Sequence, residues 1–158
     1  MKNGASKYGY TEWFSAQEMH MHSKEWFSKL SFVKDNLQFL NHMIQFFTNK
    51  PLTNRELERI KDFKNTLTES HRRLTSLYKQ VQKHMNQLEI IIDDVSQFDM
   101  EQAYRETHRE LFLQVNNYLL DYKTVKDSGF LKLSSILKKE KSKMELVKPT
   151  NKGPLPRI

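Results

Sequence analysis

The chain has 158 residues, enough for one domain, and it contains 4 glycines, 4 prolines and no cysteine. The lack of cysteine excludes disulfides, thiolate metal ligands and cysteine catalysis, and so few turn-forming residues argue against an all-β fold. No apolar run approaches the roughly 18 residues of a membrane span, and the polar first ten residues hold no apolar signal core. We therefore expect a cytoplasmic protein.

The net charge of +7 arises entirely at the end of the chain. Residues 1–122 hold 16 basic and 16 acidic side chains, whereas residues 123–158 hold 10 basic and 3 acidic ones. An asymmetry of this kind is typical of a segment that contacts an acidic partner.

A first long helix is predicted over residues 15–49. Ser15 is a capping residue, Glu18 follows three residues later, and Pro51 ends the pattern. Apolar residues recur at alternating spacings of three and four, as on a coiled-coil seam: Met19, Trp26, Leu30, Val33, Leu37, Leu40, Ile44 and Phe47. Four further apolar residues widen this face on one side: Phe32, Phe39, Met43 and Phe46. Such a broad face predicts contacts with two neighbours.

A second helix is predicted over residues 53–96, with Thr53 as its cap and Glu56 three residues later. Its seam consists of the following residues: Leu57, Ile60, Leu67, Leu74, Tyr78, Val81, Met85, Leu88, Ile92 and Val95. The same frame places Lys64 and His71 on the seam, where a polar residue commonly sets the register of a bundle.

A third helix is predicted over residues 99–147, opened by Asp99 with Gln102 three residues later. Its seam consists of Tyr104, His108, Leu111, Val115, Tyr118, Tyr122 and Val125. At Gly129 two interpretations are open, a continuous helix with or without a kink, or a break before a short amphipathic helix. Glycine inside a helix costs only about 1 kcal/mol, and a continuous third helix would match the second in length. We therefore favour continuity.

Only about three residues separate successive helices, so neighbours must be antiparallel. The sequence predicts an all-α fold, an elongated up-down-up bundle of three long helices over residues 15–147. An aromatic segment (1–14) precedes the bundle, and a flexible, proline-containing tail (148–158) follows it.

No pattern in the sequence predicts an enzyme. There is no Gly-x-Ser-x-Gly turn, no Gly-rich phosphate loop, no Glu-x-x-His and no His-Glu-x-x-His. The antiparallel registers bring His20, His22, His84 and His108 toward one end of the rod, with Glu18 near them. We interpret them as surface or half-buried histidines rather than ligands, and we expect no catalytic residue, no cofactor and no metal.

Two surfaces are candidates for binding. The broad side of the first helix (Phe32, Phe39, Met43, Phe46) predicts an apolar interface with a protein partner or with a second copy of the chain. The basic segment offers a weaker contact for a polyanion or an acidic partner, through Lys132, Lys138, Lys139, Lys141, Lys143 and Lys148.

The sequence thus predicts a non-enzymatic helical-bundle interaction or scaffold protein, with no transmembrane segment and no evident small-molecule substrate. Two alternatives stay open. One is a histidine-containing metal-binding bundle. The other is non-specific binding of nucleic acid or of a membrane surface through the basic C-terminal helix.

Overall fold

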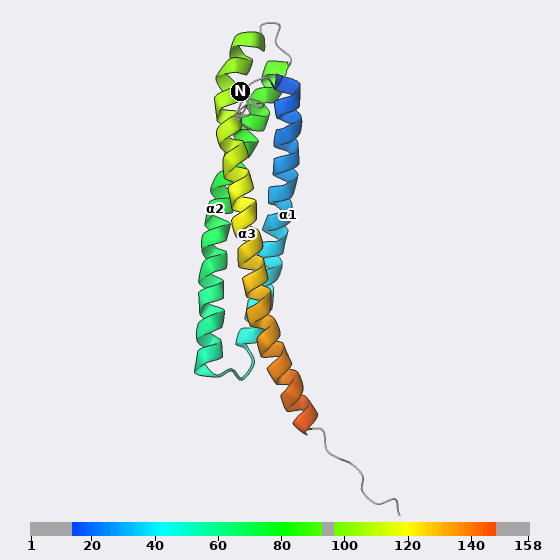
Figure 1. Ribbon diagram of the computed structural model, residues 1–158, viewed down its shortest axis with the longest axis vertical. Coiled ribbons are helices and arrows are strands. Elements are labelled where there is room, and N and C mark those ends of the chain that lie inside the picture. Colours follow the sequence, from blue (N-terminus) through cyan, green and yellow to red (C-terminus); the bar gives the residue numbers. More distant parts are fainter. Residues whose placement is uncertain (1–13, 93–96, 148–158) are drawn as a thin grey trace, which may run out of the picture.

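The computed structural model describes residues 14–92 and 97–147, with side chains for residues 14–92 and 99–139. Three helices fill these ranges: α1 (Ala16–Thr48), α2 (Asn54–Ile92) and α3 (Gln97–Val147). Each helix runs antiparallel to the one before it, and the three lie side by side as a rod (Figure 1). The described part of the chain contains no strand, so the predicted all-α three-helix bundle is confirmed. The C-terminal end of α3 continues past the turn between α1 and α2 and stands clear of both helices (Figure 1).

Two of the three predicted helix caps are present. The hydroxyl of Ser15 accepts a hydrogen bond from the amide of Glu18, and the hydroxyl of Thr53 accepts one from the amide of Glu56, both at 3.2 Å. Each hydroxyl satisfies an amide that has no partner within its own helix.

The third predicted cap is wrong. Because α3 already begins at Gln97, Asp99 lies in its first turn rather than before it. Near the start of α3, Glu101 Oε1 accepts a hydrogen bond from the amide of Ala16 in α1 at 3.2 Å. The start of α3 therefore satisfies the first amide of α1, which ties these two helices together at one end of the rod.

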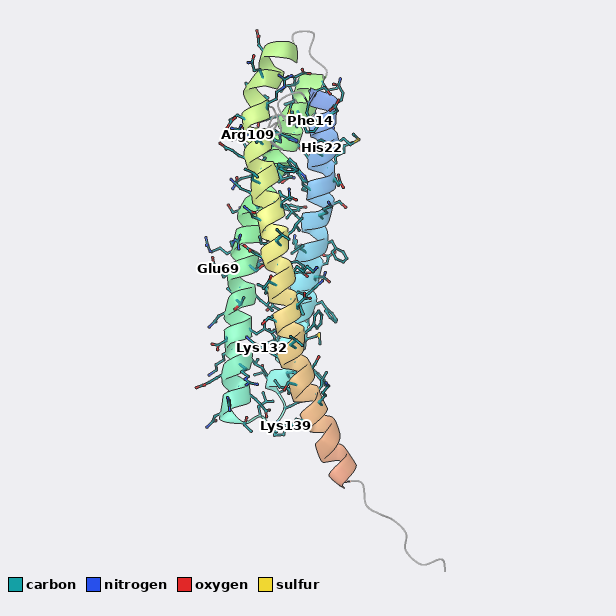
Figure 2. The ribbon with its side chains drawn as sticks, viewed as in Figure 1. Phe14, His22, Glu69, Arg109, Lys132 and Lys139 are labelled. Carbon is teal, nitrogen blue, oxygen red and sulfur yellow. The ribbon has the colours of Figure 1, made fainter. Side chains whose placement is uncertain are left out.

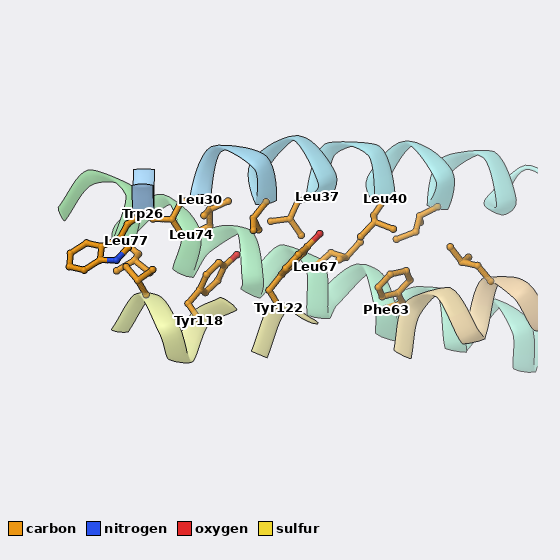
Figure 3. Close-up of a cluster of buried hydrophobic side chains, with 14 of the residues drawn as sticks. Trp26, Leu30, Leu37, Leu40, Phe63, Leu67, Leu74, Leu77, Tyr118 and Tyr122 are labelled. Atoms are coloured by element: carbon orange, nitrogen blue, oxygen red, sulfur yellow. The ribbon is translucent and has the colours of Figure 1, made fainter. Parts of the chain in front are cut away.

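The core runs along the axis of the rod and is built from all three helices (Figure 3). Every seam residue predicted for α1 is buried, and most of the seam predicted for α3 is buried as well. α2 packs closely on both other helices, whereas α1 and α3 approach each other less. Figure 3 shows leucines of α1 and α2 meeting Tyr118 and Tyr122 of α3.

Half of the seam predicted for α2 is displaced by one residue. Lys64 and His71 are exposed, and the residues just before them, Phe63 and Ser70, are buried. The row that the predicted and the observed seams have in common, from Ile60 onward, is predicted correctly. Apolar residues flank that row on both sides, so periodicity alone does not specify which flank faces the other helices. Packing selects the flank that carries Phe63 and Ser70, and the same choice brings His84 into the core.

The third helix passes through Gly129 without interruption, as the length argument favours. The ring of Phe63 from α2 lies so close to Gly129 that a Cβ atom there would overlap it. This glycine therefore permits a close approach of an aromatic ring to the α3 backbone.

Candidate functional site

The broad side of α1 is exposed in the folded chain. Phe32, Phe39 and Phe46 are 66%, 54% and 59% exposed, and they follow one another at intervals of seven residues, about two helical turns. Met43 lies half-buried beside them and packs against the core. We call these four residues the phenylalanine face. Large exposed apolar patches are uncommon on the surface of a monomer and are typical of contact sites.

α2 packs on the side of α1 away from the phenylalanine face. Phe27 packs on Tyr78 of α2, with the ring centroids 4.3 Å apart, and it lies roughly 120° around the helix from Phe39. At the end of the face, the Lys50 ammonium lies 4.4 Å from the centroid of the Phe46 ring. The face is thus an aromatic strip with a cation at its C-terminal end.

At the opposite end of the rod, one histidine from each helix forms a chain of three imidazoles. His84 Nε2 lies 3.0 Å from His108 Nδ1, and His108 Nε2 lies 3.4 Å from His22 Nδ1. Both nitrogens of the central ring are therefore engaged. We call His22, His84 and His108 the histidine chain; Figure 2 shows His22 near Phe14, far from Lys132 and Lys139.

Aromatic rings enclose the histidine chain. The indole of Trp26 stacks on His108 with 4.6 Å between the ring centroids, and Phe14 meets His22 edge-on at the same distance. His84 and His108 are buried, with 1% and 0% of their surfaces exposed. Burial lowers the pKa of His84 from 6.5 to about 4. Burial, reinforced by the neighbouring His84 and His22, lowers the pKa of His108 to about 3.

The sequence predicted only that these histidines would lie toward the same end. His22, His84 and His108 do meet, and two of them are fully buried rather than half-buried as expected. His20 is half-buried and joins none of these contacts among the described side chains, and Glu18 is exposed. Within the described residues, no group of three or more His, Asp or Glu side chains is arranged to hold a metal ion. The burial of His84 could have been found only with the correct seam of α2.

The predicted basic site lies at the far end of the rod. Lys132 is half-buried, whereas Lys138 and Lys139 are exposed. Lys139 Nζ lies 2.6 Å from Glu56 Oε1 of α2, so this lysine already has an acidic partner within the chain. Lys141 and Lys143 belong to the last turns of α3, but their side chains lie outside the described set, and Lys148 lies outside the described residues altogether.

Comparison with known proteins identifies no relative of this chain. No protein-family model matches it, and neither a curated protein nor a solved structure does. Among the described helices, none combines the length and the apolar character needed to cross a membrane.

Proposed function

We propose that this protein is a non-enzymatic interaction module whose phenylalanine face binds the same face of a second copy. The observation that carries the proposal is the heptad-spaced row of exposed rings at Phe32, Phe39 and Phe46. Removing apolar surface from water is favourable by about 25 cal/mol per Å², the costs of association offset part of this gain, and aromatic side chains contribute the largest areas. Within one chain these rings stay more than half exposed. A dimer would bury them, and that burial would stabilise the interface.

The row is complementary to itself. A two-fold axis through Phe39 brings two antiparallel copies of α1 together so that each Phe39 meets the other. The same axis sets Phe32 opposite Phe46 of the second copy at both ends. An isologous contact of this type closes after two subunits.

Charge favours the antiparallel arrangement. By helical position, the row is preceded by Glu25, which pairs with Lys29 of the same helix at 3.5 Å, and it ends at Lys50. Antiparallel helices bring Glu25 of one copy near Lys50 of the other, at both ends of the interface. Parallel helices would instead set Glu25 beside Glu25 and Lys50 beside Lys50, which is repulsive.

The first prediction concerns the mass of the protein in solution. Over a concentration series, sedimentation or light scattering should detect a dimer of the wild-type chain. Joint replacement of Phe32, Phe39 and Phe46 by glutamine should give a monomer of unchanged helix content, because the exposed rings contribute little to the fold of one chain. A wild-type chain that stays monomeric at every concentration would contradict the proposal.

A matched control separates this face from general stickiness. Ile90, Leu120 and Leu131 are 70%, 66% and 74% exposed and lie off the phenylalanine face. Their joint replacement by glutamine removes three exposed apolar side chains as well, yet it should leave the dimer intact. Glu25→Lys should weaken an antiparallel dimer by setting two cations together, and it should leave a parallel dimer unchanged.

A further inference from the structure

The histidine chain joins all three helices at the end of the rod where α1 begins. Each link is a single hydrogen bond between imidazole rings. A neutral imidazole carries one donor and one acceptor nitrogen. His108 must therefore donate to one neighbour and accept from the other, so the three rings share one direction.

The direction follows from a buried nitrogen without a partner. His84 Nδ1 is buried and makes no hydrogen bond. A buried N–H without a partner is rarer and more costly than a bare acceptor, so the proton of His84 belongs on Nε2. His84 then donates to His108, and His108 donates to His22. His22, which is half-buried, carries its own proton on Nε2.

Acid disrupts this arrangement because an imidazolium has two donors and no acceptor. A protonated His108 can no longer accept from His84, and a protonated His22 can no longer accept from His108. Stacking on Trp26 favours a cation at His108 and offsets part of this effect. The offset is incomplete, since His84 and His108 are both buried and their charges would lie side by side.

Among the described side chains, no carboxylate pairs with the rings of the histidine chain. The nearby carboxylates of α3 have basic partners: Glu101 pairs with Arg105, and Glu106 pairs with Arg109. On α1, Glu25 pairs with Lys29, and Glu18 is exposed. Lys83 of α2 and Glu110 of α3, both exposed, line an outer cleft of about 320 Å³ beside His84, together with Tyr104. None of the hydrogen bonds found among the described residues joins a carboxylate to the three rings.

The histidine chain also divides the interior of the rod. The main core extends from Trp26 toward the α1–α2 turn. Four buried apolar residues lie on the other side of the histidines and outside that core: Ala16, Met19, Leu88 and Ile91. This end of the rod therefore has apolar contacts of its own, and Trp26, which stacks on His108, joins them to the main core.

We propose that the histidine chain is a pH-sensitive switch that holds the start of α1 against α2 and α3 at neutral pH and releases it in acid. The sign follows from burial, which lowers the folded-state pKa of His84 to about 4 and of His108 to about 3. In the open state both histidines return to a pKa near 6.5 and bind protons more readily. Stability of this end is thus fully present above pH 6.5 and is lost as the pH falls from there toward 4.

The switch is tested by amide hydrogen exchange on the full chain at pH 7 and pH 5, expressed as protection factors. Two histidines with these pKa values shift the opening equilibrium by roughly 500-fold between the two conditions. Protection should fall first over residues 16–26, 84–92 and 100–108, while the segment around Leu67 stays protected. Equal protection at both pH values, or a uniform loss along the whole rod, would overturn the proposal.

A double variant removes two of the three imidazoles and keeps groups that can make the same hydrogen bonds. His22→Asn places an amide near the position of Nδ1, and His84→Gln places one near Nε2. With only His108 left to titrate, the pH effect should fall to roughly 25-fold. His71→Gln alters an exposed histidine of α2 and should reproduce the wild-type response. A double variant with the full wild-type pH dependence would refute the switch.

The wild-type chain also provides a test that needs no variant. It is an NMR titration of the histidine ring signals between pH 7 and pH 5. The rings of His84 and His108 should not titrate in the folded form, and signals of an open form should grow as the pH falls. Normal titration of both buried rings without any opening would count decisively against the switch. The phenylalanine face lies outside the released segment, so dimerisation and the switch succeed or fail independently.

Discussion

At Gly129 a missing side chain decides how closely two helices approach. The Phe63 ring occupies the space that a Cβ atom would need, and Phe63 is itself buried. Glycine in a helix weakens it by about 1 kcal/mol relative to alanine. We infer that the packing of Phe63 more than offsets this cost.

This inference predicts that Gly129→Ala destabilises the protein although alanine is the better helix former. Over-packing a core typically costs about 1–3 kcal/mol, so the net loss should be up to about 2 kcal/mol in urea denaturation. Adding Phe63→Leu should make the Gly129→Ala change less harmful, because a shorter side chain leaves room for the methyl group. Ser128→Ala, at the exposed neighbour, should change the free energy of unfolding by less than about 0.5 kcal/mol. A more stable Gly129→Ala variant would contradict the packing argument.

Buried polar groups in this core fall into two kinds. The Tyr118 hydroxyl donates to the backbone oxygen of Ser70 at 3.1 Å and shares a second hydrogen bond with the Ser70 hydroxyl at 3.0 Å. Burial raises the pKa of Tyr118, so this group stays neutral. The Tyr118–Ser70 pair therefore stabilises the bundle at any ordinary pH, in contrast to the histidine chain, whose rings titrate.

At the scale of the helices, the connections differ in how their ends are satisfied. α2 starts with a side-chain cap at Thr53, whereas α3 extends through its predicted cap residue, Asp99. An acidic residue within the first turn still interacts favourably with the helix dipole, but more weakly than a capping side chain.

We therefore expect unequal effects from two similar substitutions. Thr53→Ala should lower the free energy of unfolding by about 1 kcal/mol, since it leaves the amide of Glu56 without its partner. Asp99→Ala should cost only a few tenths of a kcal/mol. Thermal or urea denaturation of the two variants side by side measures the difference. An Asp99→Ala loss as large as that of Thr53→Ala would mean that Asp99 acts as a cap in solution.

At the scale of the whole molecule, the excess positive charge and the protruding end of α3 lie at the same end of the rod. The end of α3 that stands clear of the bundle belongs to the segment that carries the whole net charge (Figure 1). We expect lysines in this segment to bind polyanions without reading their sequence, because such affinity comes from counterion release.

Joint replacement of Lys138, Lys139, Lys141 and Lys143 by glutamine tests this property. Fluorescence anisotropy with a labelled DNA duplex should show weak, sequence-independent binding by the wild-type chain that falls steeply with salt. The variant should bind less and its logarithmic salt slope should flatten by about three units, since Lys139 is already paired with Glu56. Circular dichroism should be unchanged. The lysines would be only a solvated helix end if the wild-type chain bound neither the duplex nor anionic vesicles at low salt.

The sequence by itself determined the helices and most of the core. The caps at Ser15 and Thr53, the stop at Pro51 and the seams of α1 and α3 are local signals, because each depends on residues within one or two turns. The same periodicity separated the phenylalanine face from the seam of α1. Short connections then fixed the antiparallel order of the helices.

Only the tertiary structure decided which flank of α2 turns inward, since apolar residues lie on both sides of its central row. That choice exposes His71, buries His84 and sets Phe63 against Gly129. It also turns three histidines, far apart in the chain, into one hydrogen-bonded row. The relative rotation and register of packed helices depend on how all three surfaces interlock, and no single helix carries that information.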